Sequence, residues 1–324
     1  MKKVDNGPKA HVWFICNINT QVGVEIAQRV LHDNNVVIGG INKGLGNLEV
    51  GETTSQDNLQ LLLSKHGSNN SLSFVEIDPA NSTSCQMAFS DAFNRRPTVD
   101  VLVNCSHTMV LGEASRYENW QVNEQFESNF FHHVNVIKAI LPHFRRQLQG
   151  HIINIMDSTA SLAIPGLSLL CAANRALSGF CESLALEVSR FGIKITNIIA
   201  PLEASLFTQG VVMTEDEQTS EHVTRLRNII VREDIYPQQA ITDIVHGVIS
   251  IACNPNPPHR FVIGSDSITA VKEQIQREAE ELDDMMEVSY SCDFDLLEPE
   301  HVGYGNHMNQ KIKLEHDETK GTYM

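Results

Sequence analysis

Two residues near the middle of the chain have the chemistry of catalytic groups. Asp157 follows the apolar run 151–156 and precedes Ser-Thr-Ala-Ser. Burial of its carboxyl group would keep it protonated and able to donate a hydrogen bond or a proton. The same carboxylate could instead cap a helix or close a turn. Cys171 could act as a nucleophile, but no histidine or lysine is placed to activate it, so we expect its thiol to pack in the core.

The histidines and the other cysteines predict no metal centre. His301, His307 and His316 are spaced too irregularly for a set of metal ligands. The seven cysteines are an odd number, lie without paired spacing, and in several cases sit inside apolar runs. Free thiols in a reducing compartment are the expected state, which favours the cytoplasm.

Composition excludes two classes of function. The chain has 324 residues, 42% of them hydrophobic, and a formal net charge of −16. An acidic surface without a local basic patch would repel a phosphate backbone, so we expect no nucleic-acid partner. No apolar run reaches about 18 residues, so no membrane span is expected. The basic start of the chain is followed by an apolar stretch too short for a signal peptide.

Apolar runs alternate with amphipathic stretches along most of the chain. Unbroken apolar runs are typical of strands whose two faces are both covered, and their alternation with helical patterns indicates parallel pairing. The sequence therefore predicts an α/β fold, a single-domain, doubly wound parallel sheet (Rossmann-like) with helices on both faces. The expected strands are 11–16, 34–40, 71–77, 99–105, 151–156 and 193–199, and the expected helices are 21–33, 82–94, 117–146 and 167–191.

The remaining segments are more polar. Residues 43–70 are glycine-rich around one short helix at 59–65, and the acidic patch within 203–222 indicates a solvated flap. A charged helix is expected at 271–287. We predict a lead at 1–10, the sheet domain at 11–295 and a flexible polar tail at 296–324.

Several stretches carry a family resemblance. They are VDVLVN (99–104), ILPHFRRQLQGHIINI (140–155), the run 175–198, PPHRFVIGSDSITAVK (257–272) and SCDFD (291–295). In order and spacing, residues 10–295 resemble the short-chain dehydrogenase/reductase family, and are most similar to its 17β-hydroxysteroid- and retinol-dehydrogenase-like subgroup. The resemblance implies the fold predicted above; a function does not follow from the fold alone.

The resemblance also implies a turn that binds a nicotinamide dinucleotide. The family has T-G-x-x-x-G-x-G where this chain has residues 16–23, and only Gly23, the helix-packing glycine, matches. Asn17 could still take the left-handed conformation. Gln21 places a side chain where the phosphates need bare backbone, although the helix N-terminus still favours an anion. We therefore expect NAD(P) to bind weakly or not at all.

Two further positions match the family's cofactor contacts. Asp78 corresponds to an acidic residue that contacts the adenine, and Asn104 to the asparagine after the fourth strand. His107 stands where the family has a glycine, and residues 39–42 offer neither an arginine for a 2′-phosphate nor an acid for a 2′-hydroxyl. NAD and NADP are thus not distinguished. Asp78 and Asn104 could equally serve as turn and strand-end structure.

The catalytic set implied by the resemblance is largely replaced. In the family a tyrosine donates a proton, a lysine four residues later lowers its pKa, a serine thirteen residues earlier holds the oxygen, and an asparagine completes the relay. The matching positions here are Leu170, Asn174 and Asp157, and only Asn129 is retained. None of the five tyrosines (117, 236, 290, 304 and 323) is followed by lysine four residues later, which would place the two on one helix face.

Two hypotheses for function follow. The first is a short-chain dehydrogenase-like pseudoenzyme that has lost hydride transfer and acts by binding, as a regulatory subunit, a scaffold or a sensor of a small lipophilic ligand. The second is an NAD(P)-dependent oxidoreductase for a lipophilic alcohol or carbonyl, with Asp157 or a water as the acid. The sequence identifies neither the substrate nor the role of segment 43–70.

The resemblance also implies a partner. In the family the helices corresponding to 117–146 and 167–191 pair across a two-fold axis. We therefore expect a homodimer, or a heterodimer with a related subunit. The alternative is that the apolar residues of these helices serve only the intramolecular core: Phe130, Phe131, Val134, Phe180 and Leu184.

Overall fold

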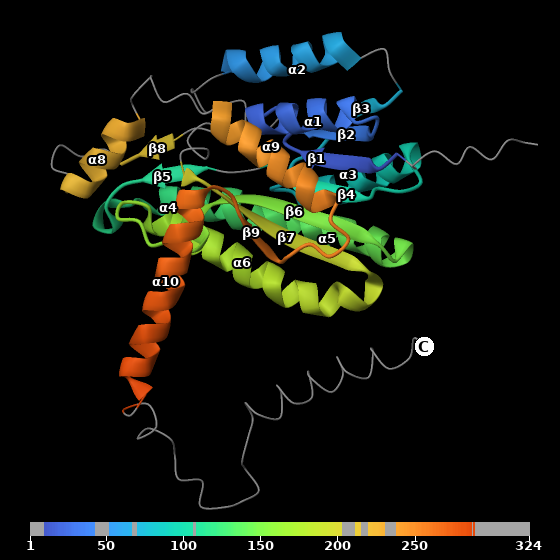
Figure 1. Ribbon diagram of the computed structural model, residues 1–324. Helices are drawn as coiled ribbons and strands as arrows, with labels where there is room; N and C mark the ends of the chain where they lie inside the picture. The colour runs from blue at the N-terminus through green and yellow to red at the C-terminus, as the bar shows by residue number, and fades with distance from the viewer. Residues whose placement is uncertain are drawn as a thin grey trace, which may run out of the picture. The chain divides into compact units, whose positions relative to one another are not determined.

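The computed structural model describes residues 10–42, 52–66, 70–105, 108–202, 211–214, 220–230, 238–286 and 288. The chain forms two compact units, residues 1–274 and 275–324, and the sheet belongs to the first (Figure 1). The predicted domain boundaries at residues 10 and 295 stay predictions. No helix of the described segments is both long and apolar enough to cross a bilayer.

Seven parallel strands of the described chain form the main sheet, in the order β3-β2-β1-β4-β6-β7-β9. The order turns back between β1 and β4, which is the doubly wound arrangement expected from the sequence. The strands are β1 Val12–Cys16, β2 Val36–Ile41, β3 Leu72–Glu76, β4 Val101–Asn104, β6 Gly150–Asp157, β7 Ile193–Ala200 and β9 Arg260–Val262.

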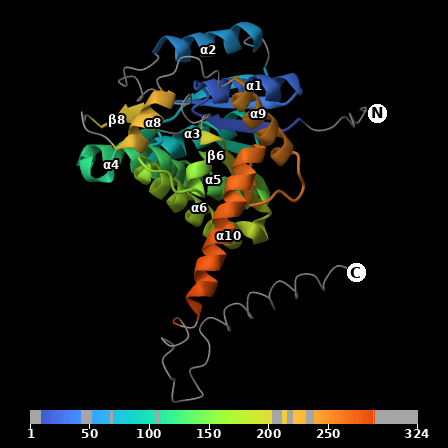
Figure 2. The ribbon, with the colours of Figure 1, turned by 60° about the vertical axis from the view of Figure 1, so that its left-hand side comes forward.

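Helices cover both faces of the sheet, because side chains of successive strand residues point to opposite faces. Along β1, Phe14 and Cys16 join the core under one helix layer, while Trp13 and Ile15 join the core under the other. The first layer contains α3 Ser82–Arg95, α5 His132–Gln147 and α6 Ser168–Val188, and the second contains α1 Gln21–His32 and α9 Gln238–Ala252 (Figures 1 and 2). The predicted fold is confirmed.

The long helix expected at 117–146 consists of three consecutive pieces. α4 Asn119–Phe126 runs into a π-helical turn at Glu127–Phe131, which continues into α5. A π turn inserts one extra residue into the helix and is frequent at functional sites. Asn129 lies inside it.

Several elements were missed or misplaced by the sequence patterns. α2 spans Glu52–His66 rather than 59–65, and α10 spans Ser265–Asp284 rather than 271–287. β8 Val211–Met213 lies within the expected flap and pairs in parallel with β5 Met109–Leu111. α8 Glu221–Ile230 follows it. Strands of three residues are too short to show a periodicity, which explains why the β5–β8 pair was not predicted.

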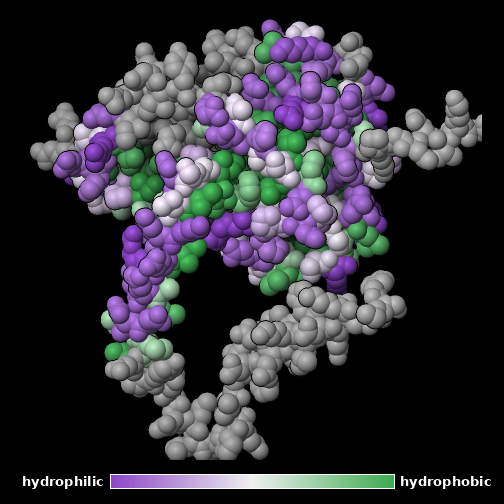
Figure 3. Space-filling model, viewed as in Figure 1, coloured by the Kyte–Doolittle hydropathy of each residue, from purple (hydrophilic) through white to green (hydrophobic). Residues whose placement is uncertain are grey.

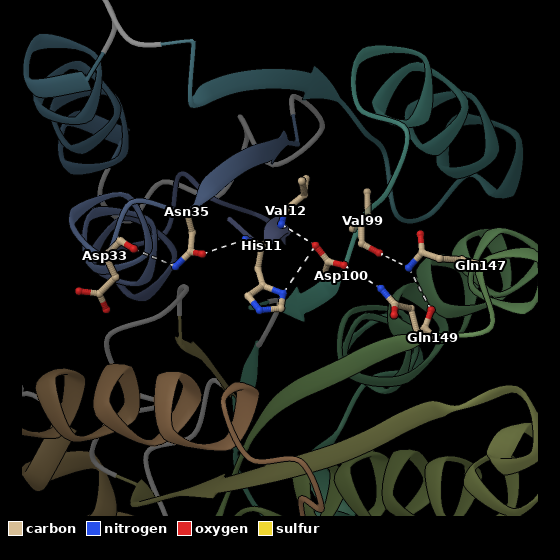
Figure 4. Close-up of polar contacts among 8 residues, drawn as sticks. All are labelled: His11, Val12, Asp33, Asn35, Val99, Asp100, Gln147 and Gln149. Carbon is tan, nitrogen blue, oxygen red and sulfur yellow. Dashed lines mark hydrogen bonds and ion pairs between the residues drawn. The ribbon is translucent and has the colours of Figure 1, made fainter. Parts of the chain in front are cut away.

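The amino ends of the strands are joined by a partly exposed polar network (Figure 4). Asp100 accepts hydrogen bonds from the backbone N–H of Val12 at 2.8 Å and from Gln149 Nε2 at 3.1 Å. The backbone N–H of His11 donates to Asn35 Oδ1 at 2.9 Å. These contacts connect β1, β4 and β6 at the edge of the sheet opposite to the candidate site.

Candidate functional site

A row of amides crosses three central strands, at the carboxyl end of β4 and in the middle of β6 and β7. The strand register places Asn104, Asn154 and Asn197 side by side on β4, β6 and β7. Asn104 Nδ2 donates to Asn154 Oδ1 at 2.8 Å, and Asn154 Nδ2 donates to Asn197 Oδ1 at 2.9 Å. All three are buried, and hydrogen bonding makes burial of such groups tolerable. Asn104 therefore has a strand-end role, and its cofactor role stays a prediction.

The turn after β1 has one left-handed residue and one position that only glycine fits. Asn17 has φ 56°, the left-handed conformation expected for it. Thr20 caps α1: its hydroxyl accepts from the backbone N–H of Gly23 at 3.1 Å and donates to the carbonyl of Asn17 at 3.0 Å. A Cβ on Gly23 would lie 2.8 Å from that same carbonyl oxygen, so only glycine fits there. Gly23 thus has the packing role predicted for it.

Two side chains of this turn bear on the predicted weak binding of a dinucleotide, those of Ile18 and Gln21. Ile18 is fully buried, and its methyl carbons lie so close to Gly39 that a Cβ there would approach them to 2.7 Å. The Ile18 side chain therefore covers the carboxyl end of β2. Gln21, partly buried, is the first residue of α1 and adds a side chain where the family has a glycine. Whether these two side chains weaken the binding of a dinucleotide stays a prediction.

Asp78 takes part in the turn that follows β3. Its Oδ1 accepts from the backbone N–H of Ala80 at 3.0 Å, and its own N–H donates to Ser84 Oγ at 2.9 Å. Asn81 caps α3 through bonds from the N–H groups of Thr83 and Ser84. The carboxylate of Asp78 is therefore used at least in part for turn structure, and its contact with an adenine stays a prediction. His107 lies outside the described residues.

Asp157 and Asn174, which are seventeen positions apart, meet at the carboxyl end of β6. Asp157 is fully buried, and its Oδ1 caps a short 3-10 helix by accepting from the N–H of Thr159 at 2.8 Å. Asn174 Nδ2 donates to Asp157 Oδ2 at 3.3 Å and to Thr159 Oγ1 at 2.9 Å. The predicted register thus brings these positions together, and the capping alternative for Asp157 is confirmed.

Leu170, at the position that the family resemblance assigns to the catalytic tyrosine, is an apolar residue. It lies in the first turn of α6 and has no exposed surface. An aliphatic side chain has no group that donates a hydrogen bond or a proton. The position that the family gives to a phenol is therefore part of a closed apolar cluster, whose other buried members are Met109, Leu111, Leu167, Cys171 and Val223.

Asn129 and Gln125, four residues apart on the helix, hold the segment after β4. Asn129 Oδ1 accepts from the N–H of Thr108 at 2.9 Å. Gln125 accepts from the N–H of Val110 at 2.8 Å and donates to the carbonyl of Thr108 at 2.7 Å. The sequence predicted only Asn129. Two buried amides at this spacing on one helix face are the signal that could have identified Gln125.

Tyr117, the one tyrosine among the described residues, contacts the first residue of α6, and the sequence did not single it out. Its hydroxyl donates to the carbonyl of Gly112 at 2.7 Å and accepts from Ser168 Oγ at 3.5 Å. Burial raises the pKa of Tyr117 and also the pKa of the Cys171 thiol. Cys171 therefore stays a thiol and packs in the core, as expected.

The doubly wound parallel sheet defines a Rossmann-like class of fold. The family model described as short chain dehydrogenase matches residues 34–215. The chain belongs to the short-chain dehydrogenase/reductase family.

Curated relatives and solved structures agree with this membership. The chain is 27% identical over 239 residues to 3-ketodihydrosphingosine reductase of Bacteroides thetaiotaomicron, covering 71% of this chain and 87% of that protein. It is 25% identical over 263 residues to human retinol dehydrogenase 8, covering 76% and 79%. A short-chain dehydrogenase from Streptomyces avermitilis superposes with a TM-score of 0.75 at 22% identity, over 88% of this chain and 100% of that one. This last likeness shows the fold.

Proposed function

We propose that the chain is a non-catalytic member of its family, which acts by binding rather than by hydride transfer. The observation that carries this proposal is the closed position 170. Leu170 is sealed in an apolar cluster, and Asn174 donates to Asp157 and Thr159 within the chain. The side chain at position 170 itself, where the family has a tyrosine, is not a proton donor.

The tyrosine and the serine that this chain lacks would supply much of the rate enhancement of hydride transfer. General acid catalysis contributes about 10²–10⁴-fold, and a donor aimed at the developing oxyanion contributes about 10²–10³-fold. Leu170 supplies neither. An ionised carboxylate at Asp157, where the family has a serine, would repel the oxyanion formed by hydride addition.

Weak or absent NAD(P) binding is part of the proposal. Its support is the buried side chain of Ile18 over the end of β2 and the side chain of Gln21 at the start of α1. NADP is bound in ElxO, whose structure shares the fold with a TM-score of 0.62 at 18% identity. The expected location is the cytoplasm, because five of the six cysteines described are buried free thiols.

The proposed partner is a second copy or a related subunit, joined through α4, α5 and α6. Phe131, in the π-helical turn between α4 and α5, is 46% exposed, and Leu186 on α6 is 68% exposed. Phe130 packs edge-on against Phe180 with ring centroids 6.3 Å apart. Leu184, by contrast, is buried in the core, which leaves the exposed Phe131 and Leu186 as the residues proposed for the contact. Light scattering at micromolar concentration tests this, since a strictly monomeric mass without a partner would contradict the homodimer.

An oxidoreductase with a rearranged site is the second candidate. The observation in its favour is the fully buried Asp157 at the carboxyl end of β6, the edge where ligands bind in open α/β sheets. A carboxyl group kept protonated by burial could donate to a substrate oxygen. The two relatives named above are a 3-ketodihydrosphingosine reductase and a retinol dehydrogenase, which favours a lipophilic carbonyl or alcohol as substrate.

Thermal unfolding with NADH and NADPH separates the two candidates. A ligand at one hundred times its Kd stabilises the folded state by about 2.7 kcal/mol. A shift in Tm without turnover of a long-chain aldehyde supports a sensor, and no shift at millimolar cofactor removes the enzyme candidate. Cofactor-dependent turnover by pure protein, lost in the Asp157→Asn variant, would overturn the main proposal.

A further inference from the structure

A basic and apolar surface lies where α5 and α6 end. The guanidinium carbons of Arg145 and Arg190 lie 5.4 and 4.8 Å from the ring centroid of Phe191, in the 3-10 turn that follows α6. A Cβ on Gly192 would lie 2.7 Å from the carbonyl oxygen of Leu148, so the turns after the two helices are in contact. Figure 3 shows hydrophobic residues beside strongly hydrophilic ones where these helices end. We refer to the following residues as the basic turn surface: Arg145, Arg146, Leu148, Arg190 and Phe191.

The three arginines of this surface are exposed and keep their positive charge. Their contacts are with uncharged groups: Phe191 lies between Arg145 and Arg190, and Arg146 Nη2 lies 2.8 Å from His143 Nδ1. Burial and the neighbouring Arg146 lower the pKa of His143, so this imidazole is neutral near pH 7. Across the described residues, no carboxylate forms an ion pair with any of the three arginines. They form a local positive region on a chain with a formal net charge of −16.

Acids are few around the basic turn surface. No Asp or Glu lies within ten positions of the first two arginines along the chain. Glu182 and Glu187 precede Arg190, and Glu182 forms an ion pair with Arg260 at 2.9 Å. The fold assembles the positive region from two segments forty-four positions apart, which explains why the sequence pattern indicated no basic patch.

Leu148 adds an exposed apolar side chain in a conformation that favours glycine. It ends α5 with φ 55° and is 65% exposed. Helices commonly end on a left-handed residue, which is usually glycine because other L-residues are strained there. The side chains of Gln147 and Gln149, on either side, donate to the carbonyl of Val99 and to Asp100 Oδ1 (Figure 4). The turn is therefore held in place, while the leucine side chain stays largely in contact with solvent.

An anionic lipid surface fits this combination of side chains. Arginine heads stay at the level of the lipid phosphates, while adjacent leucine and phenylalanine side chains enter the boundary with the acyl chains. The cytoplasmic leaflet carries anionic lipids, and each Lys or Arg near it raises the affinity about fivefold. A nucleic acid would be recognised by cations that follow its backbone and by stacking on rings, and an exposed leucine contributes to neither. A symmetric contact with a second copy would place arginines against arginines.

We propose that the basic turn surface docks the chain on a membrane that contains anionic lipid. Leu148 enters the lipid interface, and the three arginines face the lipid phosphates. The surface lies at the amino ends of β6 and β7, which begin at Gly150 and Ile193, so the candidate site is at the opposite edge of the sheet. The docking does not depend on the proposed loss of catalysis.

Sedimentation of the full chain with lipid vesicles tests the proposal. One set of vesicles is phosphatidylcholine alone, and the other contains about three-tenths phosphatidylserine. In about 0.1 M salt, we expect the partition coefficient to be about tenfold or more higher for the phosphatidylserine vesicles. The difference should shrink at 1 M salt, where the Debye length falls to about 3 Å. Equal partition into the two sets, or no binding to either, would refute the proposal.

Arginine variants of the full chain locate the contact. Arg145→Gln with Arg190→Gln should lower the partition coefficient for phosphatidylserine vesicles by about tenfold or more, because it removes two cations from the surface. Arg29→Gln with Arg260→Gln is the matched control, since it removes the same charge from arginines that pair with Asp33 and Glu182. An equal loss in the control would show an effect of net charge alone and contradict the proposed surface.

Leu148→Gly separates docking from folding. Glycine is favoured at this left-handed position, so Tm should stay unchanged or rise. Binding to the phosphatidylserine vesicles should nevertheless fall about tenfold, because the apolar side chain is lost. Leu63→Ser on α2 is the control for an exposed leucine elsewhere and should leave binding unchanged. Unchanged binding of Leu148→Gly, or binding of duplex RNA or polyglutamate in preference to the vesicles, would overturn the assignment to lipid.

Discussion

The turn at residues 16–23 and the catalytic end of β6 differ from the family pattern in opposite ways. The turn keeps its backbone, with Asn17 left-handed and Gly23 against the Asn17 carbonyl, although two of its glycines are replaced. At β6 the residue positions still converge, but Asp157, Leu170 and Asn174 carry different chemistry. The turn is held by packing on which the fold depends. The catalytic side chains contribute chemistry rather than packing, so the fold persists when they are exchanged.

Leu170→Ala gives the largest expected effect. If position 170 is now core, removing a fully buried leucine side chain costs about 2–5 kcal/mol of unfolding free energy. Urea unfolding measures this, and Leu63→Ala on the exposed side of α2 is the control, with an expected change below about 0.5 kcal/mol. A neutral or stabilising effect of Leu170→Ala would instead indicate an open pocket kept for a ligand.

Gly23→Ala tests whether packing holds the turn. A Cβ at this position would lie 2.8 Å from the Asn17 carbonyl oxygen and 2.9 Å from Ile18 Cα, so overpacking should cost about 1–3 kcal/mol. Gly179→Ala on α6 is the matched control, because nothing lies within 4 Å of a Cβ there. In a helix interior that change should stabilise by up to about 1 kcal/mol. Equal effects of the two substitutions would show that the turn is not constrained by Gly23.

Asp157→Asn tests the role of the carboxyl group at the carboxyl end of β6, where the family has a serine. The new amide can still accept from the N–H of Thr159, but its Nδ2 would meet Asn174 Nδ2, which is also a donor. Loss of that bond should cost about 1–2 kcal/mol. Asp100→Asn at the partly exposed amino edge is the control and should cost less. A loss of measurable NADPH-dependent turnover in Asp157→Asn would assign the carboxyl group a catalytic role.

The family resemblance assigned Asp157 and Asn174 to one site, and the structure brings these two residues into contact. β6 ends at Asp157, and α6 begins eleven residues later, so the distances along the chain fix which residues meet. The six longer strands were predicted for a similar reason, since their apolar runs are unbroken. Where one strand is followed directly by one helix, the positions expected from the local sequence pattern agree with those in the structure.

The contacts that were not predicted depend on packing between distant segments. Gln125 bonds to the backbone of Thr108 and Val110, seventeen and fifteen positions away, and its four-residue spacing from Asn129 does not by itself indicate those two partners. Ile18 meets Gly39 across the β1–β2 pair. The pairing of β5 with β8 joins segments about one hundred residues apart. Such contacts follow from the tertiary arrangement, which periodicity does not encode.

Restoring the two glycines that the turn lacks should give the smallest effect of the substitutions considered. It measures how much Asn17 and Gln21 reduce the affinity of the turn for a dinucleotide. In Asn17→Gly with Gln21→Gly the backbone is already left-handed at residue 17, so little conformational cost arises, and the start of α1 regains bare amides for an anion. We expect the affinity for NADH to rise by about five- to tenfold, measured by fluorescence titration. Ile18, still buried over Gly39, limits the gain. A rise of a hundredfold or more would show that Ile18 does not obstruct the site and that the two substitutions alone separate this chain from a dinucleotide-binding relative.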